Sequence, residues 1–95
     1  MTTQQSLFPV CDAFRQIQGY IDTKWMKVRY YQPTTDMILI HIEPRRDAIP
    51  DDVDMEYYLM EQTDVYADDF AEWFPHLNVR YTERDTDWYI ISITQ

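Results

Sequence analysis

Carboxylates are the main candidates for chemistry in this chain, and they are concentrated in one stretch. Ten acidic residues lie between Asp47 and Glu72, with no Lys or Arg among them. Paired carboxylates carry out acid–base catalysis and glycoside hydrolysis, and clustered carboxylates bind calcium. These ten charges exceed the formal net charge of −9, so the rest of the chain sums to +1. A function that depends on negative charge would be located in this stretch.

The pattern of these acids does not favour catalysis or metal binding. An acid–base pair needs two carboxyls around a pocket, one of them with a pKa raised by burial, whereas these acids are predicted on solvent-facing positions and in a loop. Asp52, Asp54 and Glu56 alternate like calcium ligands. A calcium loop of the EF-hand type also needs Gly at its sixth position and Glu at its twelfth, and the twelfth residue here is Thr63. We expect no enzymatic activity, no cofactor and no metal.

Other chemical motifs are incomplete. Gly19 is the only glycine, so no glycine-rich phosphate-binding loop can be written. His41 and Glu43 match the first part of a zinc-deaminase signature, but its PCxxC part is absent. Cys11 is the only cysteine and is predicted to be a small buried hydrophobe. We interpret the histidines as structural or surface residues.

Aromatic residues lie among the acids, and together they indicate a surface that binds a basic partner. Asp64, Asp68 and Glu72 are four residues apart, so they would share one side of a helix. High net charge can also serve solubility alone, but solubility needs dispersed charges of both signs. The candidate partner-binding residues are Asp51, Asp52, Asp54, Glu56, Tyr57, Tyr58, Glu61, Asp64, Asp68, Asp69 and Glu72.

The basic residues give a weaker signal. Lys24, Lys27, Arg29, Arg45 and Arg46 form the main basic concentration, and alternation puts Lys27 and Arg29 on the polar face of a strand. With ten acids nearby, we expect these cations to pair with the protein's own carboxylates. Direct binding to nucleic acid is therefore disfavoured.

Length and composition predict one acidic domain over residues 1–95, with residues 1–5 frayed. Hydrophobic residues make up 45% of the chain, which is enough for one compact core. We find no signal peptide and no apolar run of membrane-spanning length. With one cysteine and no internal disulfide, we expect a cytoplasmic protein.

Periodicity predicts a fold of the α+β class, with element order α-β-β-α-β-β. A helix is expected from Leu7 to near Ile21, with Ser6 as its cap. Residues 53–62 fit neither period cleanly, and acids near their start favour a helix with Asp51 as its cap. The other expected elements are strands 25–32, 37–43, 77–83 and 88–94, turns 33–36 and 84–87, and helix 64–74. We expect a four-stranded antiparallel sheet with the helices packed on one face.

Three binding functions are compatible with these features. The first is an inhibitor that mimics nucleic acid and occupies the basic surface of a nuclease complex or another nucleic-acid-binding protein. In composition alone, the chain is similar to phage anti-CRISPR and anti-restriction proteins. The second is an immunity or antitoxin protein that neutralises a basic toxin. The third is an acidic secretion or assembly chaperone, a dimer whose apolar groove would include Met55, Leu59 and Met60. A homodimer is possible in each case, and no membrane partner is expected.

Overall fold

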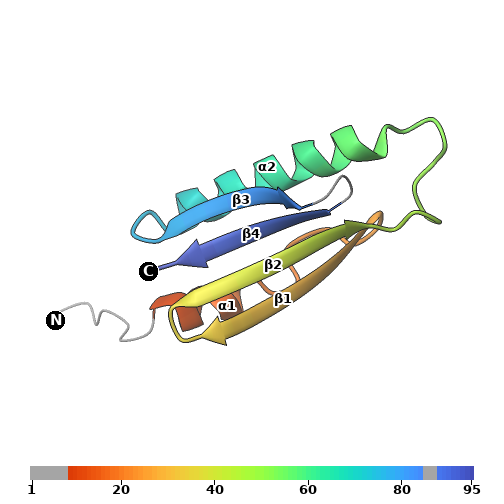
Figure 1. Ribbon diagram of the computed structural model, residues 1–95. Coiled ribbons are helices and arrows are strands. Elements are labelled where there is room, and N and C mark those ends of the chain that lie inside the picture. Colours follow the sequence, from red (N-terminus) through yellow and green to blue (C-terminus); the bar gives the residue numbers. More distant parts are fainter. Residues whose placement is uncertain (1–8, 85–87) are drawn as a thin grey trace, which may run out of the picture.

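The computed structural model describes residues 9–84 and 88–95, and its helices and strands follow the predicted order (Figure 1). The four strands form one antiparallel sheet in the order β1-β2-β4-β3. The α+β class and the four-stranded antiparallel sheet are thus confirmed. The elements are α1 (Pro9–Ile17), β1 (Met26–Thr34), β2 (Met37–Pro44), α2 (Met55–Trp73), β3 (Asn78–Arg84) and β4 (Trp88–Thr94).

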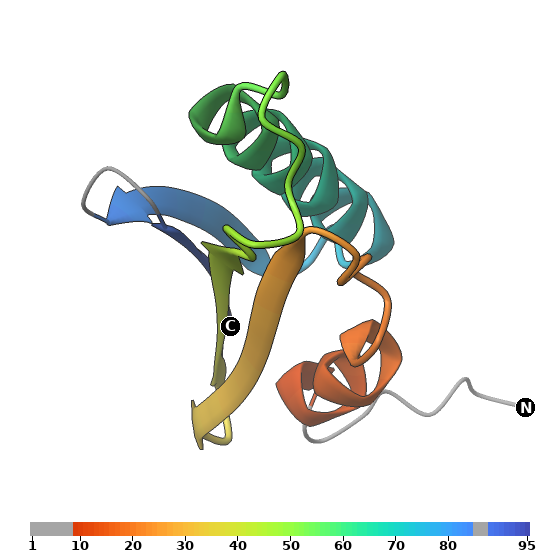
Figure 2. The same ribbon diagram turned by 90° about the vertical axis from the view of Figure 1, so that its right-hand side faces the viewer.

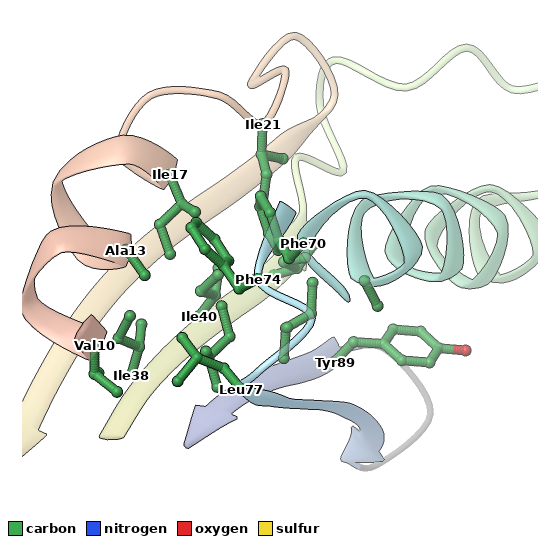
Figure 3. Close-up of a cluster of buried hydrophobic side chains, with 14 of the residues drawn as sticks. Val10, Ala13, Ile17, Ile21, Ile38, Ile40, Phe70, Phe74, Leu77 and Tyr89 are labelled. Carbon is green, nitrogen blue, oxygen red and sulfur yellow. The ribbon is translucent and has the colours of Figure 1, made fainter. Parts of the chain in front are cut away.

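Both helices pack on the same face of the sheet (Figure 2). Successive strand residues point to opposite faces, and in the central strands β2 and β4 every second residue is buried. In Figure 3, Val10, Ala13 and Ile17 of α1 lie close to Ile38 and Ile40 of β2. The inward strand residues that are fully buried are Met26, Ile38, Ile40, Ile42, Ile91 and Ile93.

The structure corrects two predicted boundaries in the first half of the chain. Helix α1 ends at Ile17, four residues before Ile21, because Gly19 takes a positive φ of 79° that ends the helical backbone. Strand β1 continues to Thr34 and pairs it with Met37, so the hairpin turn has two residues where four were expected. The predicted cap Ser6, the fraying of residues 1–5 and most of turn 84–87 lie outside the described residues.

The ambiguous segment 53–62 is the first part of α2, which runs unbroken through the predicted helix 64–74 and ends at Trp73. Its cap is Asp54 and not Asp51, because the Asp54 side chain accepts a hydrogen bond from the backbone N–H of Tyr57. The buried positions of α2 include Leu59, Thr63 and Phe70. One long amphipathic helix therefore covers the part of the sheet that α1 does not.

Among the described residues, two buried hydroxyls have no hydrogen-bond partner, those of Tyr30 and Thr63. Thr63 is completely buried, and its hydroxyl makes no hydrogen bond. An unpaired buried hydroxyl costs free energy because it has left water without a replacement partner. Thr63→Val removes the hydroxyl and keeps the shape, so it should raise the free energy of unfolding by about 1 kcal/mol.

Urea denaturation checks this prediction. The control is Thr23→Val, because Thr23 is exposed in a loop and its substitution should change stability by less than about 0.5 kcal/mol. A Thr63→Val protein that is less stable than the wild type would show that the hydroxyl contributes a favourable interaction.

Candidate partner-binding surface

Helix α2 presents a row of carboxylates to solvent along its whole second half. Leu59, Thr63 and Phe70 are buried against the sheet, and at 100° per residue the side opposite them carries Glu61, Asp64, Asp68 and Glu72. All four of these acids are exposed. We call these four residues the acidic ridge. From Glu61 to Glu72 the ridge extends about 16 Å along the helix axis, at a rise of about 1.5 Å per residue.

The charge of the ridge is not neutralised by the protein's own cations. Among the described Lys and Arg side chains, none forms an ion pair with a ridge carboxylate. The last turn of α2 also has no basic residue, although cations are favoured there. Each like-charged pair four residues apart costs a helix about 0.2–0.5 kcal/mol. Asp64 with Asp68, and Asp68 with Glu72, are two such pairs, so the ridge retains unfavourable repulsion.

The remaining predicted acids surround the start of α2. Asp51 and Asp52 are exposed in the turn before the helix, and Glu56 is exposed in its first turn. Asp54 is occupied as the helix cap, with its side chain 3.2 Å from the Tyr57 nitrogen. The predicted acids therefore form two groups, the ridge and a smaller group at the start of α2. Within the smaller group, Asp54 stabilises the end of the helix as its cap.

Two carboxylates of α2 accept hydrogen bonds from tyrosines of other elements. The Tyr81 hydroxyl of β3 donates to Asp64, and the Tyr20 hydroxyl of the α1–β1 loop donates to Asp69, each over 3.0 Å. Asp69 is half-buried and lies beside the ridge. These bonds raise the pKa of both tyrosines, because a carboxylate favours the neutral hydroxyl that donates to it. A hydroxyl donor leaves the negative charge of each carboxylate in place.

The two predicted tyrosine anchors differ. Tyr57 is 58% exposed beside the ridge. Tyr58 is half-buried, and its ring makes an edge contact with Trp25 at a centroid distance of 5.1 Å. Burial also raises the pKa of Tyr58. Tyr57 is therefore available to a partner, and Tyr58 mainly packs α2 onto the loop before β1.

The three residues suggested for a chaperone groove do not share a surface. Leu59 is completely buried in the core, Met55 packs against that core, and Met60 is 44% exposed. The three side chains point in different directions because they lie on one helix, with about 100° between successive residues. The sequence pattern of 53–62 did not show clearly that this segment is helical.

Three further findings concern the described part of the chain. No three metal-binding side chains converge among its residues. Neither helix has the length and apolar character needed to cross a membrane. A concavity of about 530 Å³ lies away from the ridge, at one end of the sheet, and its lining includes Lys27, Arg45 and Trp88.

Sequence reasoning missed a second surface, the helix-free face of the sheet. The exposed cations Lys27, Arg29 and Arg80 lie on this face, together with the aromatic residues Tyr31 and His41. Strand alternation had identified Lys27 and Arg29 as outward-facing. We expected Lys27 and Arg29 to pair with nearby acids. In the structure, α2 carries the acidic ridge on the other side of the sheet.

Comparison of the chain with models of protein families, with curated proteins and with solved structures found no match. The function must therefore be inferred from the surfaces themselves.

The hydrogen bond between Tyr20 and Asp69 gives a direct test of this geometry. Asp69→Asn removes the carboxylate that is the main cause of the raised pKa of Tyr20, so this pKa should fall toward the ordinary value of 10.0. Carbon NMR of the tyrosine rings during a pH titration measures it. Because the folded-state pKa is raised, the stability contributed by this bond is complete below pH 10.0 and is lost as the pH rises through the folded-state value.

Tyr81 serves as the internal control in the same titration. Its pKa is raised mainly by Asp64, so Asp69→Asn should leave it unchanged. An unchanged pKa of Tyr20 in the variant would contradict the contact.

Proposed function

We propose that this protein is a non-enzymatic inhibitor that binds a basic protein surface through the acidic ridge. The target is a protein whose Lys/Arg-lined groove normally holds DNA or RNA, such as a nuclease complex of the kind that anti-CRISPR or anti-restriction proteins block. The observation that carries the proposal is the exposed and unneutralised row from Glu61 to Glu72.

The charge density of this helix surface supports nucleic-acid mimicry. With Asp69 included, five carboxylates occupy about 16 Å of helix axis, or about one charge per 3–4 Å. A single strand of duplex DNA carries one negative charge per about 3.4 Å of axis. A groove that accepts a phosphate backbone would therefore meet a similar line of charge on α2.

The placement of the charges also supports binding over solubility alone. Solubility would be achieved by dispersed charges without the repulsion between neighbouring carboxylates. Here the repulsion is retained on one helix, next to the exposed ring of Tyr57. Exposed tyrosines are frequent anchors in protein interfaces, and a concentrated field increases association rates with an oppositely charged partner.

An immunity or antitoxin protein would use the same ridge against a basic toxin, so it belongs to the same proposal with a different target. We place the protein in the cytoplasm, because one cysteine and no internal disulfide suit a reducing compartment.

Charge reversal on the ridge tests the proposal. Asp68→Lys with Glu72→Lys should abolish capture of the target from a lysate of the native host, because both residues are exposed and neither makes a hydrogen bond that the fold needs. The expected target elutes with salt, since screening weakens electrostatic contacts, and is identified by mass spectrometry. Purified wild-type protein should then compete with an oligonucleotide for that target.

The matched control is Asp36→Lys with Asp47→Lys. It makes the same change in net charge at two exposed positions away from the ridge and should leave capture unchanged. Equal loss of capture in both double variants would show that net charge alone matters, and retained capture in the ridge variant would reject the ridge as the binding surface.

A further inference from the structure

The face of the sheet opposite the helices has an unusual composition for a solvent-exposed surface. Its centre carries Leu39 and Ile90, which are half-buried although neither helix covers them. In an antiparallel sheet with one solvated face, the outward positions are normally polar. Apolar residues in the middle of this face indicate a surface that a partner covers.

Aromatic rings extend across this face. His41 of β2 lies between Tyr31 of β1 and Trp88 of β4, with ring centroids 4.9 Å and 5.2 Å apart. Tyr31 is 42% exposed, and the other two rings are half-buried. The run therefore spans three adjacent strands, with neighbouring ring planes inclined to each other by 62° and 49°.

Cations lie on both edges of the same face. Lys27 and Arg29 are on edge strand β1, and Arg80 is on edge strand β3. All three are exposed, and their side chains make no ion pair or hydrogen bond with the described residues. Glu43 is the acidic residue opposite Lys27 in the register. The concavity at this end of the sheet is lined by three cations, two acids, Pro44 and Trp88; the charged residues are Lys27, Arg45, Arg46, Glu43 and Asp47.

We propose that this helix-free face binds single-stranded nucleic acid. Single strands combine negative phosphates with exposed bases, and proteins hold them with basic grooves and aromatic stacking platforms. Here Tyr31, His41 and Trp88 would stack against bases, while Lys27, Arg29 and Arg80 would contact phosphates. A short strand of two or three nucleotides would cover the aromatic run.

A second copy of the chain is a poorer occupant. Both edge strands carry cations, so two sheets placed face to face would bring cations near cations. The acidic ridge of another copy could meet this face only in a head-to-tail contact, which builds a ring or a filament and not a two-fold dimer. Charge and ring chemistry together favour an anionic, aromatic polymer.

This inference reverses the expectation that the chain does not bind nucleic acid directly. That expectation assumed that the acids lie beside the cations. The ridge lies on the solvent side of α2, with the helix and the sheet between it and this face (Figure 2). At physiological salt, charges separated by more than about 8 Å are largely screened. The inference does not depend on the inhibitor function, because the two surfaces are separate.

Fluorescence anisotropy with a labelled oligothymidylate of about ten nucleotides tests the proposal. Binding should be detected at low salt, and the logarithm of the binding constant should fall with the logarithm of salt concentration with a slope of about −2, because three phosphate contacts contribute about −0.7 each. Arg29→Gln should make this slope shallower by about 0.7. Tyr31→Ala should weaken binding by about 5- to 160-fold, because stacking on the ring is lost.

Two variants control for folding and for location. Tyr31→Phe keeps the ring and should bind like the wild type. Tyr57→Ala removes an exposed tyrosine beside the ridge and should have no effect. No binding at low salt, tighter binding to duplex than to single strands, or an unchanged affinity of Tyr31→Ala would each overturn the proposal. Equal binding of a polyglutamate peptide would also overturn it and would indicate an acidic protein partner.

Discussion

The rest of the structure depends on the burial of one apolar sheet face. Ile38, Ile40, Ile91 and Ile93 point to the same side of the central strands and are completely buried. That side must be covered because removing apolar surface from water is the main favourable term in folding. One side of helix α2 covers most of this apolar face, so the other side of the helix is exposed to solvent. The direction of the acidic ridge is thus a consequence of core packing.

The same constraint separates the charges of the protein. Both helices lie on one face of the sheet, so the carboxylates of α2 lie on that side. Lys27, Arg29 and Arg80 point from the other face, as the strand register shows. The two charged surfaces are therefore not paired with each other. A protein with dispersed charges and the same core would have neither surface.

The sequence contained most of the fold, because strand and helix periods are local signals. Alternation in 88–94 predicted the buried face of β4, which includes Tyr89, Ile91 and Ile93. Segment 37–43 was predicted only as an Ile-rich buried strand, and its alternating burial emerged from the structure. The segment 53–62 was harder, because Tyr57 and Met60 are exposed apolar residues that obscure the helical period. The i, i+4 spacing of the ridge was readable, whereas the contacts of Asp69 with Tyr20 and of Tyr58 with Trp25 join distant parts of the chain. Such long-range contacts, and the basic sheet face, appear only once the strands are in register.

The central claim is that the acidic ridge is one coherent surface for basic partners. Amide NMR spectra recorded during titration with an arginine-rich peptide test it most directly. The account predicts that chemical-shift changes concentrate around Glu61, Asp64, Asp68 and Glu72 and leave Lys27 and Arg29 unaffected. Changes spread evenly over acidic residues elsewhere in the chain, such as Asp12 and Asp36, would contradict it.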